Sequence, residues 1–223
     1  MCIGNCVNEL TEGEGYRFYE DIISYDLIDS INGYLDTLHP VRALSSGKVY
    51  AEKSDIHHLD DDIAFWWSQM VMDWPEVQAI NEILLPIISL ELNNAVWYAS
   101  DVVTINSDSK LVNPHVDTPH RFREYNNDNR FLGVQCIVSL QDTSPEQGTT
   151  GFVPYSHEPD WDIDLCYNGA YNKYFYDFCE QKYMPKGSVL MYNCRLLHSS
   201  MPNYSPNPRP MLLLNYLNGD IVE

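Results

Sequence analysis

The chain has 223 residues, of which 44% are hydrophobic and 13% aromatic, as in a folded globular protein. Its 13 basic and 32 acidic residues give a net charge of −19, which argues against general binding to nucleic acid or anionic membranes, because both depend on Lys and Arg. No apolar stretch approaches the roughly 20 residues that span a bilayer, and no signal peptide is recognisable. The six cysteines form no CxxC pair, so we expect a reducing, cytoplasmic location. The oligomeric state is left open.

The first third of the chain predicts helices. Residues 16–38 place apolar side chains at helical spacing. A second helix is expected to begin near Asp60–Asp62 and to continue through IAFWWSQMVMDW, because acidic side chains favour a helix N-terminus.

A third helix is predicted within residues 75–92. Pro75 suits the first helical position, and Pro86 is expected to interrupt or end the helix. We expect this helical part, about residues 16–92, to pack on the outside of one sheet.

From residue 94 the pattern changes to short β-like runs separated by Gly, Pro, Asn and Asp. The runs are NAVWYASDVVTIN, FLGVQCIVSLQDT, GTTGFVPYS, GSVLMYN and RPMLLLNYLN. None is followed by a helix of crossover length, so a parallel doubly wound sheet is not expected. We predict one domain over 1–223 that is mainly β with flanking helices, its antiparallel jelly-roll core spanning about 94–217. The tyrosine-rich segment 155–184 is predicted to be a surface excursion or a lid.

The stretch LVNPHVDTPH at 111–120 contains a candidate metal site. His115 and Asp117 are two residues apart, so an extended strand projects both side chains from the same face. With a third ligand from another strand they would form the two-histidine, one-carboxylate arrangement of non-haem Fe(II) oxygenases. His120 lies three residues beyond Asp117, and we expect it to face the substrate or the solvent.

The third ligand has two candidates, His157 and His198. His198 is followed by a predicted strand that begins at Arg209, whose guanidinium can hold a carboxylate through two hydrogen bonds. Ser200 lies two residues beyond His198 and can offer a hydroxyl to the same carboxylate. His157 has no arginine at a useful distance, so we favour His198.

A second histidine cluster occurs in IHHLDDD, which contains His57 and His58. Adjacent histidines on a loop point apart, and a helix start explains the three aspartates. We therefore expect no metal there.

The segment 94–217 resembles the phytanoyl-CoA dioxygenase family of Fe(II)- and 2-oxoglutarate-dependent oxygenases. The matching features are the HxD motif, the stretch GTTGFVPYSHE at 148–158, and H-x-S followed by an arginine eleven residues after the histidine. Thr149 and Tyr155 stand where the family usually has glycine. The resemblance implies a double-stranded β-helix fold.

The resemblance also implies an activity. Fe(II) is expected on His115, Asp117 and His198, with 2-oxoglutarate chelating the iron and its far carboxylate on Arg209. With O2 as the oxidant, such an enzyme hydroxylates a small organic molecule and releases succinate and CO2. Asp117 favours hydroxylation, because halogenating relatives lack this carboxylate. The scarcity of cations argues against an acyl-CoA substrate.

Further contacts and alternatives complete the prediction. The candidate contacts to 2-oxoglutarate are Thr104, Asn106, Gln135 and Ser200, and those to the substrate are Arg121, Arg123 and Arg130. A cupin-type site would need an HxH motif that the sequence lacks, and a zinc hydrolase would leave Arg209 without a role. A non-catalytic jelly roll that binds a ligand or a partner is the alternative.

Overall fold

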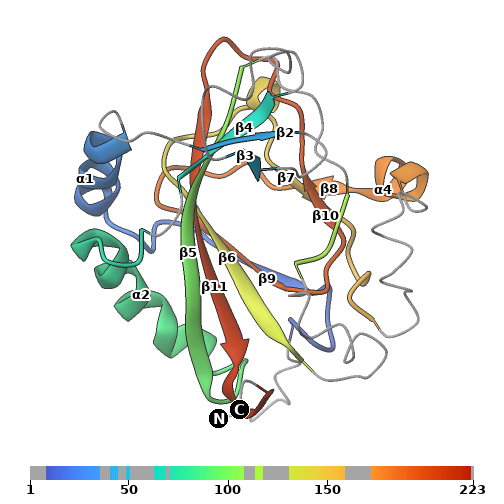
Figure 1. Cartoon of the computed structure of the whole chain (residues 1–223). Coiled ribbons are helices and arrows are strands. Elements are labelled where there is room, and N and C mark those ends of the chain that lie inside the picture. The colour runs from blue at the N-terminus through green and yellow to red at the C-terminus, as the bar shows by residue number, and fades with distance from the viewer. Residues whose placement is uncertain are drawn as a thin grey trace.

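The computed structural model describes residues 9–35, 41–44, 49–50, 63–68, 71–107, 114–117, 131–158 and 172–221. Two antiparallel sheets face each other, and two helices cover the outer side of the larger sheet (Figure 1). The helices are α1 (Tyr25–Leu35), α2 (Pro75–Ile88) and α4 (Asn172–Phe178), with 3-10 turns at Pro145–Gln147 and Gly219–Ile221.

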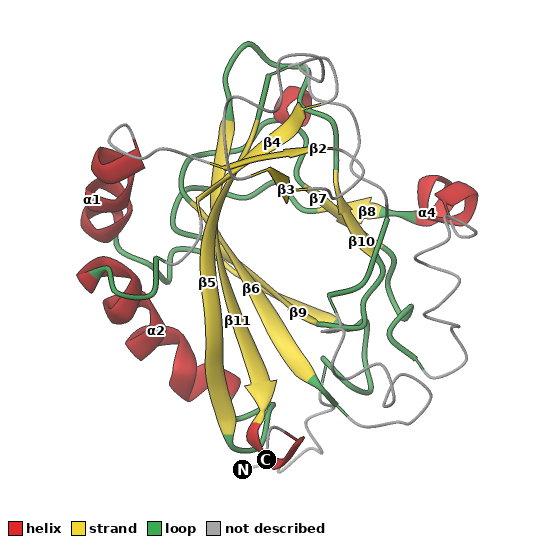
Figure 2. Cartoon of the chain, in the orientation of Figure 1, coloured by secondary structure: helices red, strands yellow, loops and turns green. Residues whose placement is uncertain are grey.

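The larger sheet has eight strands in the order β1-β9-β6-β11-β5-β4-β2-β3, and the smaller sheet has the order β10-β7-β8. All strand pairs in the described ranges are antiparallel. This confirms the mainly β fold with helices outside one sheet (Figure 2). The strands are β1 (Tyr16–Tyr19), β2 (Val41–Leu44), β3 (Val49–Tyr50), β4 (Ile63–Ser68), β5 (Ala95–Ile105), β6 (Gly133–Ser139), β7 (Thr150–Phe152), β8 (Glu180–Gln181), β9 (Val189–Asn193), β10 (His198–Ser200) and β11 (Arg209–Asn218).

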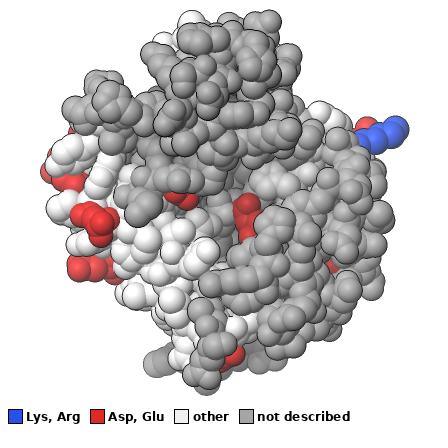
Figure 3. Space-filling model, in the orientation of Figure 1, with Lys and Arg blue, Asp and Glu red and all other residues white. Residues whose placement is uncertain are grey.

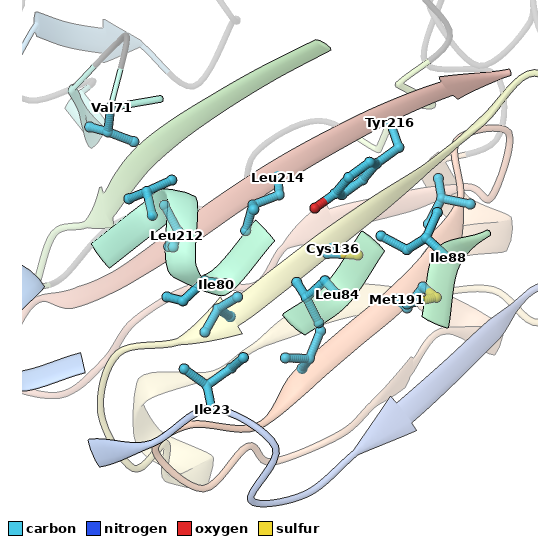
Figure 4. Packing of buried hydrophobic residues seen from close by; sticks show 14 of the residues in the cluster. Ile23, Val71, Ile80, Leu84, Ile88, Cys136, Met191, Leu212, Leu214 and Tyr216 are labelled. Carbon is cyan, nitrogen blue, oxygen red and sulfur yellow. The ribbon is translucent and has the colours of Figure 1, made fainter. Parts of the chain in front are cut away.

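The larger sheet separates two apolar clusters, because successive side chains of a strand point to opposite faces. On β11, Leu212 and Leu214 pack toward the helices, and Met211 packs toward the barrel interior. Helix α2 meets the sheet with buried residues at helical spacing, among them Ile80 and Leu84 (Figure 4). The interior cluster joins the larger sheet to Phe152 of the smaller sheet, so the space between the sheets is the barrel interior. The site is built there.

The helix predicted after Asp60–Asp62 is wrong over Ile63–Ser68, which form strand β4. This strand pairs with β2 on one side and β5 on the other. Its run of Ile, Phe and two Trp has high β propensity, and pairing with two neighbours stabilises the extended form. The aspartates themselves lie outside the described residues.

The other two helix predictions were correct in type and inexact in extent. The helix expected over residues 16–38 begins at Tyr25, and its first part is the strand β1, which pairs with β9. Pro75 does occupy the first turn of α2. Pro86 lies inside α2, which ends two residues later at Ile88, so the proline falls in the last turn, where little of the helix follows.

The predicted lid segment 155–184 contributes a strand to the smaller sheet. β8 pairs with β7, and α4 precedes it on the far side of the barrel from α1 and α2 (Figure 1). Figure 3 shows acidic side chains over the side that carries α1 and α2, with basic atoms of the described residues at the opposite edge. Within the described residues, no helix is both long and apolar enough to cross a membrane. A lid role for this segment stays a prediction.

Candidate metal centre

The HxD segment is held against the distal histidine by backbone hydrogen bonds. His115 and His198 form an antiparallel bridge in which each amide donates to the other's carbonyl, both at 2.9 Å. The amide of Asp117 donates to the carbonyl of Cys194 at 2.8 Å. These bonds fix residues 114–117 as an extended segment beside β10, so two residues of the motif and one distant residue meet at one point.

His115, Asp117 and His198 form the one group of metal-ligating side chains found in the described part of the chain, with potential ligand atoms within 4.8 Å of one another. Asp117 Oδ1 lies 3.7 Å from His115 Nε2, and Asp117 Oδ2 lies 3.2 Å from His198 Nε2. Two imidazole nitrogens and one carboxylate on one side of a point are the donor set of a facial Fe(II) site. The residues present therefore fit such a metal.

The imidazole of His198 is oriented by a hydrogen bond to the backbone carbonyl two residues before it. Its Nδ1 lies 2.9 Å from the carbonyl of Leu196. Because a carbonyl only accepts, Nδ1 carries a proton and Nε2 is directed at the cluster, which is the tautomer that a metal requires. His198 is buried, whereas His115 and Asp117 are partly exposed.

Tyr192 belongs to the same cluster and was missed by the sequence prediction. Its hydroxyl lies 3.1 Å from Asp117 Oδ2 and 3.2 Å from His198 Nε2. The residue lies on β9, six positions before His198, within a run that the sequence identifies only as a strand. Its inward direction depends on strand parity, which no motif marks.

The cluster shifts the proton affinities of its members. Burial raises the pKa of Asp117, but His198, His115 and the hydrogen bond from Tyr192 outweigh it and lower the pKa to about 2. Burial lowers the pKa of His198, yet the Asp117 carboxylate and the Leu196 carbonyl raise it above its ordinary value. Burial and then Asp117 raise the pKa of Tyr192, so the phenol keeps its proton.

Arg209 starts β11 and is completely buried, with an exposed fraction of 0%. Its Nη1 donates to the carbonyl of Gln147 at 2.9 Å, and its buried Nε and Nη2 have no hydrogen-bond partner among the described residues. Burial lowers the pKa of Arg209 to about 10. A buried cation with two free donors side by side suits a carboxylate bound in bidentate fashion.

Close packing around this guanidinium depends on one glycine. Gly148 has a φ of 62°, and a Cβ there would lie 2.6 Å from the Pro202 carbonyl and 3.4 Å from Arg209 Nη1. A larger residue would be strained in that conformation and would crowd the carbonyl.

The remaining predicted contacts to 2-oxoglutarate differ in their position relative to the His-Asp-His cluster. Ser200 lies on β10 two residues from His198, and so on the same face of that strand. Gln135 is buried and pairs with Tyr192 on the barrel face of the sheet. Thr104 shares the opposite face with Val102, which packs toward the helices, so the structure does not bring it to the cluster.

Asn106 directly follows β5 and is partly buried. His157 is buried against Gly15 and Leu196 and is not a member of the metal-ligating group. Burial lowers the pKa of His157. The predicted residues that lie outside the described part of the chain are His57, His58, His120, Arg121, Arg123 and Arg130.

Solved structures with a similar fold include an enzyme dependent on alpha-ketoglutarate, also called 2-oxoglutarate, and two proteins with 2-oxoglutarate bound. The epimerase SnoN from nogalamycin biosynthesis is 15% identical, with a TM-score of 0.71 over 96% of this chain and 82% of that chain. HygX from Streptomyces hygroscopicus, with nickel and 2-oxoglutarate bound, is 15% identical, with a TM-score of 0.67 over 92% and 84%. EctD from S. alaskensis, with 2-oxoglutarate and 5-hydroxyectoine, is 17% identical, with a TM-score of 0.65 over 98% and 77%. At these identities the similarity defines the jelly-roll fold class.

The family follows from the sequence itself. The family model described as phytanoyl-CoA dioxygenase (PhyH) matches residues 25–211, which is more than half of the chain. The chain belongs to the phytanoyl-CoA dioxygenase family. No curated protein sequence matches it.

Proposed function

We propose that this protein is an Fe(II)- and 2-oxoglutarate-dependent oxygenase that hydroxylates a small organic molecule. The observation that carries the proposal is the buried Arg209 guanidinium, which shares a barrel with a His-Asp-His cluster and whose Nε and Nη2 meet no partner in the part of the chain that the structure describes. A molecule with a metal-chelating end and a second carboxylate would satisfy both features. 2-Oxoglutarate has that chemistry.

Each residue has a defined role in this proposal. His115, Asp117 and His198 would hold Fe(II), which when bound supplies the activation of O2 coupled to conversion of 2-oxoglutarate into succinate and CO2. Arg209 would bind the far carboxylate of 2-oxoglutarate through its two free donors, with Ser200 and Gln135 as further contacts. The buried interior cluster, which includes Tyr192 and Leu196, would limit the access of bulk water from that side of the site.

Hydroxylation of a small molecule is the outcome we propose. The similar solved structures include an epimerase and a complex with 5-hydroxyectoine, so the fold by itself does not select the reaction. Asp117 supplies the carboxylate ligand that halogenating relatives lack. The net charge of −19 disfavours polyanionic substrates such as acyl-CoA.

Anaerobic titration with Fe(II) and 2-oxoglutarate tests the proposal. The wild-type protein should develop the weak visible charge-transfer band of an Fe(II)–2-oxoglutarate complex and should release succinate when O2 is admitted. Arg209→Gln should lose the band at the same 2-oxoglutarate concentration. Arg17→Gln is the matched control, since Arg17 pairs with Glu91 at 2.8 Å outside the barrel. Absence of the band from the wild-type protein would contradict the proposal.

A further inference from the structure

The hydroxyl of Tyr192 contacts two of the three proposed metal ligands, at 3.1 Å from Asp117 Oδ2 and 3.2 Å from His198 Nε2. We infer that Tyr192 is a positioning residue that reserves Asp117 Oδ1 for the metal and keeps this carboxylate monodentate. The inference rests on the proposed function, because it concerns how Asp117 binds iron.

The direction of the hydrogen bond distinguishes the two oxygens of Asp117. An ionised carboxylate only accepts hydrogen bonds, so the Tyr192 hydroxyl donates its single proton to Oδ2. Oδ2 also lies 3.2 Å from His198 Nε2, whereas Oδ1 lies 3.7 Å from His115 Nε2. Oδ2 is thus engaged by the protein, and the lone pairs of Oδ1 remain for a metal between the imidazoles.

The hydroxyl can impose this orientation because its ring is immobilised. Tyr192 is 1% exposed and lies on strand β9, which pairs on both sides, with Tyr16 and Gln135 directly opposite on its two neighbours. Its ring centroid lies 4.8 Å from that of His198. A donor held by packing on several sides fixes the partner carboxylate in the way that outer hydrogen bonds orient metal ligands.

A monodentate carboxylate matters for the number of open positions. Three single-atom ligands on one face of a six-coordinate metal leave three positions, and a chelating 2-oxo acid occupies two of them. If both oxygens of Asp117 bound the metal, a further position would be lost. The hydrogen bond from Tyr192 opposes that arrangement.

Tyr192→Phe removes this hydroxyl and changes no other atom. We expect the dissociation constant for Fe(II), measured anaerobically by calorimetry on the metal-free protein, to rise about tenfold, as for other partners of metal ligands. Co(II) in the same site should show a changed visible spectrum, because the intensity of its bands depends on coordination number. A residue with a merely structural role would not change that spectrum.

Tyr216→Phe is the matched control. Tyr216 is also 1% exposed, and its hydroxyl donates to Asn81 Oδ1 at 2.9 Å on the helix-facing side of the same sheet. This variant should bind Fe(II) and Co(II) like the wild type. Thermal unfolding of both metal-free variants establishes that each is folded.

The outcomes separate the two proposals. Wild-type affinity and spectrum in Tyr192→Phe would overturn the inference and leave the proposed function intact. Equal weakening in both variants would also overturn it, because the effect would then come from general destabilisation. Failure of the wild-type protein to bind Fe(II) would overturn the proposed function and the inference with it.

Discussion

The two faces of the larger sheet are built from alternate residues of the same strands, yet they differ in character. The helix-facing side is apolar, as Cys136 of β6 and Leu214 of β11 show (Figure 4). The adjacent residues on the same strands, Gln135 on β6 and Asn215 on β11, face the barrel. The barrel side also holds the buried Arg209, with two donors that no atom of the described residues satisfies. One face is packed against the helices by apolar residues, and the other combines an apolar cluster with polar groups that could bind a ligand.

The largest expected effect is on the barrel side. Asp117→Ala removes a proposed metal ligand, so Fe(II) affinity should fall by more than about 100-fold, beyond the range for outer partners of a ligand. Turnover of 2-oxoglutarate, measured as succinate release, should be lost with it. Asp177→Ala, in the exposed helix α4, is the control and should bind Fe(II) normally. Retained turnover in Asp117→Ala would contradict the assignment of the proposed metal site to the barrel side of the sheet.

The helix-facing side should respond in stability alone. Leu84→Ala truncates a residue of α2 that is 0% exposed, and the free energy of unfolding should fall by about 2–5 kcal/mol. Leu90 is 84% exposed, and Leu90→Ala should change the free energy of unfolding by less than about 0.5 kcal/mol. Urea denaturation measures both. Turnover per folded molecule should equal the wild-type value, and a lower value would show that the two faces are coupled.

Arg209→Met should weaken 2-oxoglutarate binding and raise stability, whereas Leu84→Ala should lower stability and leave turnover unchanged. Loss of a charge-assisted pair should weaken 2-oxoglutarate binding by about 1.5–3 kcal/mol, roughly 10- to 150-fold. The cosubstrate-free variant should gain about 1 kcal/mol in stability, because an incompletely paired buried cation is replaced by an apolar chain. Arg17→Met should show the reverse. It should be less stable, because the ion pair with Glu91 is lost, and it should keep the wild-type affinity for 2-oxoglutarate. A destabilised Arg209→Met would mean that this arginine holds the fold together.

The smallest effect concerns pH. Burial lowers the pKa of His157 below 6.5, so below pH 6.5 the unfolded chain takes up a proton that the folded protein does not. Folding stability should therefore fall as the pH drops below 6.5, until the lowered folded-state pKa is reached. His157→Gln should reduce the difference in unfolding free energy between pH 7.5 and pH 5.5. An unchanged difference would show that His157 does not contribute to this acid sensitivity.

The sequence predicted the parts of the site that lie on a motif. His115 and Asp117 are two residues apart on an extended segment, and Arg209 at the start of the following strand pointed to His198, in agreement with the family resemblance. The structure brings the three candidate ligands together. Their role as metal ligands stays a proposal.

Residues whose role depends on strand parity could not be predicted in the same way. Thr104 and Tyr192 both lie in strands that the sequence identifies, but a shift of one residue moves a side chain to the other face. Parity is set by pairing with strands far along the chain, so Thr104 was expected near the site and Tyr192 was not. Strand β4 was missed for a related reason, since its extended form depends on pairing with β2 and β5.

His115 and His198 are 83 positions apart, yet two reciprocal backbone hydrogen bonds of 2.9 Å join them. During synthesis, the chain up to Ser200, the end of β10, must have left the ribosome before these two imidazoles can meet. The complete set of proposed ligands therefore exists only once these two segments have paired. A metal held by all three side chains would bind the folded protein, and the ions available at that stage would decide which metal fills the proposed site.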